Sequence, residues 1–243
     1  MNIAVIFAGG VGSRMNSKEA KPKQFLEIHG KPIIIHTLEL FEYHTEIDAI
    51  VIACVKEWME YLQDLISKYN LKKVKTVVPG GSTGQGSIYQ GLLAAKEVAA
   101  GEKSIVLIHD GVRPLINKKV ISENIASVKS HGSAITSVTV KETVLVVSED
   151  GAIDYVPSRA ASRLARAPQS FWLDEVFSVH QKALQDGITD FIDTCTMMQH
   201  YGKQLYLVEG PQENIKITTP DDFYTMRALL DARENAQIYG YQE

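Results

Sequence analysis

The sequence predicts an α/β fold built on a doubly wound, mainly parallel sheet, and two observations carry this prediction. Short apolar runs rich in β-branched residues are typical of strands that are buried on both faces. These runs alternate along the first half of the chain with segments whose apolar residues recur at helical spacing. Right-handed crossovers then place successive strands parallel in one sheet, so we expect ligands at its C-terminal edge.

Strands and helices follow in strict alternation through the first half. The strands are expected at Ile3–Phe7, Ala49–Ala53, Val74–Val78 and Ser104–His109, and the helices at Pro32–Tyr43, Glu57–Lys68, Ser87–Ala99 and Lys118–Lys129. The second helix shows the clearest apolar stripe, with Tyr61, Leu65 and Tyr69 on one face.

The alternation breaks at about residue 136. Thr136–Val147 alternates polar and apolar residues, Ser148–Gly151 has turn composition, and Ala152–Val156 returns as a short strand. This pattern predicts a β-hairpin arm at about residues 137–160, projecting from a single domain that spans residues 1–243. Because exposed strand edges need covering, we expect the arm to contact a second subunit.

Further elements are predicted beyond the arm. Helices are expected at Leu173–Gln185 and Thr194–Tyr201, a strand near Gln204–Val208, and a short strand around Lys216. Thr219 is the expected N-cap of a last helix, with Pro220 in its first turn.

Composition excludes several classes of protein. The chain has 243 residues, of which 45% are hydrophobic and 22% charged, and its net charge of −4 argues against a nucleic-acid-coating protein. No apolar stretch is long enough to span a membrane, and the apolar start is expected to be a core strand rather than a signal peptide. Cys54 and Cys195 show no CxxC spacing, which predicts a reducing, cytoplasmic location without disulfides and a buried Cys54.

A glycine-rich loop directly follows the first strand and leads into a cationic segment. Its residues are Ala8, Gly9, Gly10, Gly12, Ser13 and Arg14, with Lys23 close behind. Bare backbone amides beside cations suit a polyphosphate. The loop lacks the Gly-Lys-Ser/Thr of a Walker A loop and the third glycine of a dinucleotide fingerprint. A tight chain reversal is the alternative explanation of the glycines alone.

Other polar groups follow later strands. Asp110 suits Mg²⁺, although Asp-Gly is also a common turn pair, and Arg113 either anchors an anion or braces the loop. The Gly80–Ser87 loop either holds a base or ribose or merely connects two elements, and Lys216 faces either the site or solvent. Arg159, Arg163 and Arg166 lie on an expected mobile segment that suits a phosphorylated acceptor.

Together these segments resemble the cytidylyltransferases that make CDP-alditols and CDP-methylerythritol, from Ile3 to about Leu229. The matching motifs are Ala8-Gly-Gly-x-Gly-x-Arg14-Met15, Pro22-Lys23-Gln24, Gly80-Gly81 with Ser87, His109-Asp110 with Arg113-Pro114, Pro168-Gln169, and Asn214-Ile-Lys216-x-Thr218. The resemblance implies a Rossmann-like core, a homodimer whose arms complete each other's sites, CTP as co-substrate and Mg²⁺ as cofactor.

The resemblance also implies roles for individual residues. Arg14, Lys23 and Lys216 are the expected catalytic residues, which steady the α-phosphate of CTP, and Asp110 is the expected Mg²⁺ ligand. The residues implied to bind CTP are Ala8, Gly9, Gly10, Gly12, Ser13, Arg14, Lys23, Gly80, Gly81, Ser87 and Asp110. Those implied to hold the acceptor phosphate are Arg113, Thr143, Arg159 and Lys216, with Thr143 and Arg159 reaching in from the partner's arm.

The sequence departs from the methylerythritol-phosphate pattern near the acceptor. That pattern has Arg at Gly84 and Thr at Ala167 and Ile192, whereas the Asp110-Gly-Val-Arg-Pro loop is nearer the ribitol-phosphate form. Lost hydroxyls change which polyol a site holds. These departures favour D-ribitol 5-phosphate as acceptor, giving CDP-ribitol and pyrophosphate, over 2-C-methyl-D-erythritol 4-phosphate of isoprenoid synthesis.

Two further alternatives remain open at this point. A catalytically inactive, nucleotide-binding regulator would bind CTP without releasing pyrophosphate, but Arg14, Lys23, Asp110 and Lys216 are all intact. A sugar-1-phosphate nucleotidyltransferase would share the opening loop, but the Pro-Gln motif, the expected arm and the short chain argue against it.

Overall fold

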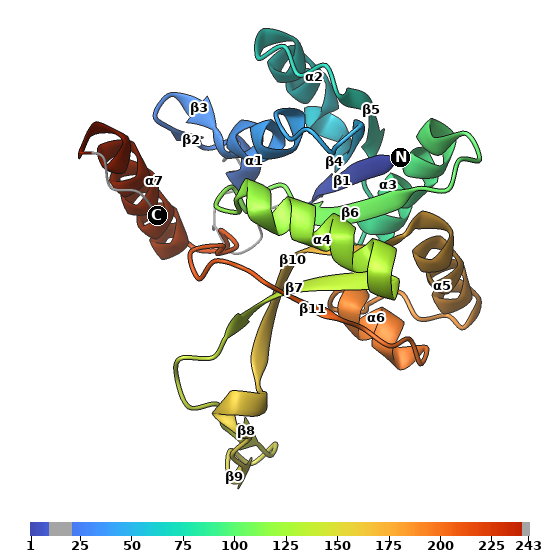
Figure 1. Ribbon diagram of the computed structural model, residues 1–243, viewed down its shortest axis with the longest axis vertical. Coiled ribbons are helices and arrows are strands. Elements are labelled where there is room, and N and C mark those ends of the chain that lie inside the picture. The colour runs from blue at the N-terminus through green and yellow to red at the C-terminus, as the bar shows by residue number, and fades with distance from the viewer. Residues whose placement is uncertain (10–20, 240–243) are drawn as a thin grey trace.

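A mixed sheet with the strand order β11-β7-β10-β6-β1-β4-β5 forms the centre of the protein (Figure 1). The computed structural model describes residues 1–9 and 21–239, and the side chains of residues 1–9 and 21–235. The strands of this sheet are β1 (Asn2–Ala8), β4 (Ala49–Cys54), β5 (Val74–Pro79), β6 (Ile105–Asp110), β7 (Ser133–Thr139), β10 (Arg163–Trp172) and β11 (Leu207–Glu209).

Helices cover both faces of the sheet. They are α1 (Ile33–Glu42), α2 (Met59–Lys68), α3 (Gly84–Ala99), α4 (Lys118–His131), α5 (Leu173–Gln185), α6 (Thr194–His200) and α7 (Pro220–Tyr239). Apolar residues of α1, α2 and α4 pack on one face of the sheet, and those of α3, α5 and α6 on the other. Alternate residues of β1 enter the two cores, Ala4 and Ile6 on one side and Ile3 and Val5 on the other. The predicted doubly wound α/β fold is therefore confirmed.

The sheet is parallel except at β10. β1 pairs in parallel with β4 and β6, β4 with β5, and β7 with β11, whereas β10 is antiparallel to both β6 and β7. The prediction of a mobile segment was wrong for Arg163 and Arg166, which belong to this strand. Charged residues and Pro168 obscured it, because they are depleted in strands, and its register with β7 shifts between Ala165 and Gln169.

The predicted hairpin is shorter than expected. The first part of the alternating run belongs to β7, whose burial in the sheet separates it from the projecting segment. We call residues 140–162 the arm; it contains β8 (Val146–Val147), β9 (Ile153–Tyr155) and the 3-10 helix η3 (Arg159–Ala161). Figure 1 shows the arm extending away from the sheet.

Short elements precede the first two helices. The 3-10 helix η1 (Lys23–Phe25) and the strands β2 (Glu27–Ile28) and β3 (Lys31–Pro32) precede α1, and the 3-10 helix η2 (Lys56–Trp58) precedes α2. The segment around Lys216 is an extended loop, not the predicted strand. Within the described part of the chain, no helix is long and apolar enough to cross a bilayer.

Candidate active site

A cavity of about 350 Å³ opens beside the C-terminal ends of β1 and β6. Phe7 and Asp110, which are opposite each other in the register of these two strands, both line it. Strand order reverses between β1 and β6, since β4 and β5 extend to one side and β10 and β7 to the other. Ligands of open α/β sheets bind at such a reversal, so the cavity lies where the sequence predicted a site.

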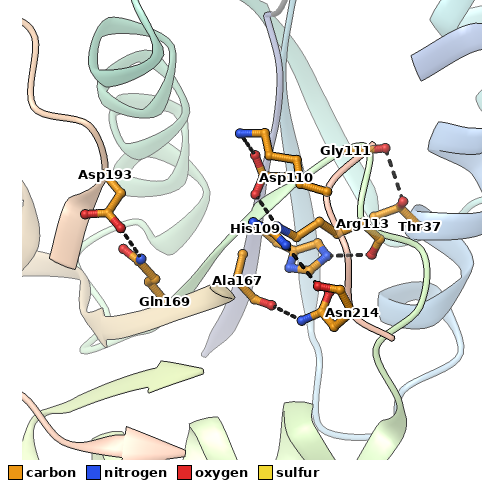
Figure 2. A network of polar contacts seen from close by, with 10 residues as sticks. Thr37, His109, Asp110, Gly111, Arg113, Ala167, Gln169, Asp193 and Asn214 are labelled. Atoms are coloured by element: carbon orange, nitrogen blue, oxygen red, sulfur yellow. Dashed lines mark hydrogen bonds and ion pairs between the residues drawn. The ribbon is translucent and has the colours of Figure 1, made fainter. Parts of the chain in front are cut away.

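Asp110 is the electrostatic centre of this cavity (Figure 2). Its Oδ2 accepts a hydrogen bond from Arg113 Nε at 2.7 Å, and its Oδ1 lies 2.5 Å from Lys216 Nζ. Burial alone would raise the pKa of the Asp110 carboxyl, but the charges and hydrogen bonds of Lys216 and Arg113 outweigh it and lower that pKa to about 2. Asp110 is therefore a buried carboxylate that stays ionised because two cations face it.

Lys216 reaches Asp110 because hydrogen bonds fix the loop that carries it. Asn214 Nδ2 donates to Ala167 O at 2.7 Å, Arg113 Nη1 donates to Asn214 O at 2.9 Å, and Ile217 N donates to Val112 O at 3.2 Å. The ammonium group also lies 5.6 Å from the centre of the Phe7 ring. Of the two orientations that the sequence left open, Lys216 therefore takes the one toward the cavity.

His109 supports the Asp110 loop from within the core. Its side chain is fully buried, its Nε2–H donates to Arg113 O at 3.0 Å, and its ring packs edge-on against Phe41. Burial lowers the pKa of the imidazole to about 4, so the ring is neutral at physiological pH.

A second cluster joins Gly9 to the Gly80–Ser87 loop. A Cβ on Gly9 would lie 2.6 Å from Ser87 Oγ, and one on Gly80 would lie 3.0 Å from the same atom. Thr83 caps α3 by accepting from Gly86 N at 3.0 Å. The two predicted nucleotide loops thus meet at the N-terminus of α3, where backbone N–H groups favour an anion.

Lys23 is placed close to the end of β1 by its neighbour Gln24. The Gln24 side chain is buried and donates from Nε2 to Ala8 O at 2.9 Å, while Phe25 stacks on Trp58 with ring centres 5.1 Å apart. The other predicted residues of the opening loop, which are Gly10, Gly12, Ser13 and Arg14, lie outside the described residues.

Thr143 and Arg159 occupy the arm and not the cavity of their own chain. Both side chains are exposed, and Arg159 Nη2 donates to Thr143 Oγ1 at 3.2 Å. The two predicted acceptor residues are therefore brought together, but the arm carries them away from the sheet edge that holds Asp110 (Figure 1).

Sequence reasoning missed the wall of the cavity opposite Asp110. Gln169 Nε2 donates to Asp193 Oδ2 at 2.9 Å (Figure 2). Asp193 Oδ1 accepts from Thr196 N at 2.8 Å as the N-cap of α6. An aspartate before a helical run is a recognisable cap signal, and Pro168-Gln169 is one of the matching motifs, but neither side chain was given a role in the site. Arg166, one of the three arginines that the sequence suggested for a phosphorylated acceptor, also lines the cavity.

Comparisons with known proteins agree with this arrangement. The family model described as IspD, 2-C-methyl-D-erythritol 4-phosphate cytidylyltransferase, matches residues 2–232. A ribitol-5-phosphate cytidylyltransferase of Streptococcus agalactiae serotype III is 58% identical over 99% of this chain and all of that protein. One from Vibrio parahaemolyticus is 52% identical over the same shares.

More distant relatives carry the name of the family model. A 2-C-methyl-D-erythritol 4-phosphate cytidylyltransferase of Clostridium acetobutylicum is 39% identical over 95% of this chain and 97% of that protein. The crystal structure of 4-diphosphocytidyl-2C-methyl-D-erythritol synthase from Anaerococcus prevotii superposes with a TM-score of 0.81 at 27% identity, covering 95% of this chain and 96% of that one. The motif resemblance is thereby confirmed, and the chain belongs to the 2-C-methyl-D-erythritol 4-phosphate cytidylyltransferase (IspD) family of nucleotidyltransferases.

Proposed function

We propose that the protein transfers CMP from CTP to D-ribitol 5-phosphate, giving CDP-ribitol and pyrophosphate. One observation carries the choice of acceptor: relatives named for ribitol 5-phosphate are 52–58% identical, whereas those named for methylerythritol phosphate are 36–39% identical. The cavity supports the same choice. Ala167 and Ile192 both line it, and neither offers the hydroxyl expected for methylerythritol phosphate at those positions.

The proposed reaction is a direct in-line displacement. An oxygen of the acceptor phosphate attacks the α-phosphorus of CTP, the bond to the bridging oxygen of the β-phosphate breaks, and pyrophosphate leaves with the electron pair. A phosphate monoester is largely dianionic at neutral pH, so it needs no general base. A neutral, fully buried His109 fits this requirement. Lys216, with Arg14 and Lys23, would neutralise charge that develops at the α-phosphate.

Asp110 fits a Mg²⁺ ion that is held jointly by protein and nucleotide. Each of its oxygens contacts one cation, which leaves lone pairs on both, and the low pKa keeps the group anionic. Mg²⁺ commonly takes one protein carboxylate together with phosphate oxygens. When bound, the ion would neutralise phosphate charge. Within the described residues no group of three His, Cys, Asp or Glu side chains forms a fuller cage.

The arm is proposed to complete the site of a partner subunit in a homodimer. Its exposed apolar residues are Leu145, Val147, Ile153, Tyr155 and Val156. Contiguous exposed apolar residues mark interaction surfaces. Thr143 and Arg159 are exposed on the same arm, so docking of the arm would bring their hydroxyl and guanidinium to the cavity of the partner subunit. The free thiols of Cys54 and Cys195 support the proposed cytoplasmic location.

Pyrophosphate release tests the function directly. Purified protein receives CTP and Mg²⁺ with ribitol 5-phosphate, arabinitol 5-phosphate, glycerol 3-phosphate or 2-C-methyl-D-erythritol 4-phosphate. The highest kcat/KM is expected with ribitol 5-phosphate, and chelation by EDTA should abolish turnover. A higher kcat/KM with methylerythritol phosphate would contradict the acceptor. CTP binding without pyrophosphate release from any acceptor would instead identify an inactive regulator.

A further inference from the structure

Arg166 presents an uncompensated guanidinium to the active-site cavity. It lies on β10, and its Nε is buried without a hydrogen-bond partner. No hydrogen bond or ion pair holds this side chain among the described residues, whereas the neighbouring Arg113 is bound by Asp110 and by Asn214 O. An arginine carries five N–H donors, and leaving a buried one unpaired is costly.

The charges around the cavity leave Arg166 without a counterion. Asp110 is engaged by Arg113 and Lys216, and both oxygens of Asp193 accept from Gln169 and Thr196 N. Burial lowers the pKa of Arg166, and the charge of Arg113 lowers it further, although the group remains a cation. The cavity therefore holds excess positive charge at one place, which an anion would neutralise.

The residues around Arg166 show which part of the cavity it lines. Its strand neighbours Ala167 and Gln169 line the same cavity, as does Ile192, where the sequence departs from the methylerythritol-phosphate pattern. Gly84, where the sequence also departs from that pattern, lines the cavity at the start of α3, whereas Gly9, Gly80 and Ser87 do not. Arg166 consequently lies on the acceptor side of the cavity.

We propose, on the basis of the proposed function, that Arg166 binds the phosphate of the polyol phosphate acceptor from within the same subunit. Its planar fork can donate two parallel hydrogen bonds to one phosphate group. It would hold the attacking oxygens beside Lys216 while leaving Arg113 bound to Asp110. Acceptor binding would then draw on a guanidinium in the chain's own cavity in addition to the arm residues Thr143 and Arg159.

The test compares Arg166→Gln and Arg166→Lys with wild type in pyrophosphate release. Arg166→Gln should raise the KM for ribitol 5-phosphate about 10- to 100-fold, the loss expected for hydrogen bonds to a charged group, and leave the KM for CTP within about twofold. Arg166→Lys keeps the charge without the fork and should give an intermediate KM. Arg227→Gln, which removes the same charge from an exposed position on α7, is the matched control.

A second readout separates ligand binding from a structural role. Because the wild-type Nε–H is buried without a partner, Arg166→Gln should unfold at the same or a higher temperature than wild type. An unchanged acceptor KM, an equal rise in the KM for CTP, or a lowered unfolding temperature would each overturn the proposal. If Arg166→Gln does not fold, the KM values of Arg166→Lys decide the question alone.

Calorimetric titration tests phosphate binding by Arg166 separately from the proposed reaction. Ribitol 5-phosphate and inorganic phosphate are titrated into wild type and Arg166→Gln in the absence of CTP. If wild type releases no pyrophosphate from any acceptor, the proposed function fails, yet binding of phosphate that is weakened in Arg166→Gln would still support the anion site. Equal phosphate affinity in the two proteins would overturn the site whatever the activity.

Discussion

Asp110 shows how neighbouring side chains decide the charge of a buried group. Its carboxyl is only 7% exposed, and desolvation by itself disfavours the ionised form. Two cations at 2.5 and 2.7 Å reverse this preference. The carboxylate in turn holds Lys216 and Arg113 at the cavity, so each of the three groups depends on the others for its charge and position.

Replacing Lys216 by alanine should lower kcat about 100- to 1000-fold, the usual cost of removing one electrostatic contact to a transition state. Wild type and variant are compared by pyrophosphate release at saturating CTP and ribitol 5-phosphate. Lys216→Arg, which keeps a charge with different geometry, serves as the control and should retain part of the lost activity. Near-normal kcat in Lys216→Ala would contradict the catalytic assignment.

The same variant has a defined consequence for acid stability. The pKa of Asp110 is about 2 in the folded protein and about 3.9 in an unfolded chain, so its contribution to stability is present above pH 4 and lost as the pH falls toward 2. Without Lys216, the folded pKa moves upward and this contribution shrinks. The acid-unfolding midpoint of Lys216→Ala, followed by circular dichroism, should therefore lie at a higher pH than that of wild type.

At the scale of elements, the start of α3 depends on close backbone approach between two glycines. A Cβ on Gly81 would lie 2.6 Å from the carbonyl carbon of Gly86, so the loop or the helix must shift to admit it. Gly81→Ala should cost about 1–3 kcal/mol of stability, lowering Tm by several degrees, and raise the KM for CTP.

Gly84 provides the matched control for this prediction. A Cβ there meets no atom within 4 Å, and alanine is favoured over glycine at this helical position. Gly84→Ala should therefore keep or raise Tm, as measured by thermal unfolding. If Gly81→Ala were as stable as Gly84→Ala, the close approach would not constrain the loop.

The elements also show what the sequence could and could not predict. Apolar, β-branched runs located β1, β4, β5 and β6, and helical periodicity located α5 at its observed bounds. The expected burial was wrong for β5, which lies at the edge of the sheet and has no fully buried residue. β10 escaped prediction because it combines charged residues and proline with a place in the sheet. Its neighbours β6 and β7, distant in sequence, supply the pairing that local propensity opposes.

The residues of the candidate site also divide into those that the sequence located and those that it did not. Residues in local motifs, such as Asp110 after β6 and Ser87 beside Gly80, could be found because strand ends converge at one sheet edge. Gln169 and Arg166 could not be placed, since their positions depend on the unexpected strand. Sequence pattern therefore located the nucleotide half of the cavity better than the acceptor half.

For the molecule as a whole, the arm determines whether an active site is formed by one chain or by two. It carries exposed apolar side chains together with Thr143 and Arg159, whereas Asp110 and Lys216 lie at the sheet edge. If arms act on partner subunits, an active site combines one chain's cavity with the other chain's arm. Symmetric exchange of identical arms would close the assembly as a dimer.

Mixing two inactive variants should restore activity if this assembly is correct. Lys216→Ala impairs the cavity and Arg159→Gln impairs the arm, so a mixed dimer holds one site in which both parts are intact. At equal amounts with free subunit exchange, half of the dimers are mixed and half of their sites work, which gives about a quarter of the wild-type rate of pyrophosphate release. The control replaces Lys216→Ala by the double variant Lys216→Ala/Arg159→Gln, whose mixture with Arg159→Gln contains no intact site and should stay inactive. If the single variants exchange subunits, as followed by sedimentation of differently labelled chains, yet activity does not return, each arm must serve the cavity of its own chain.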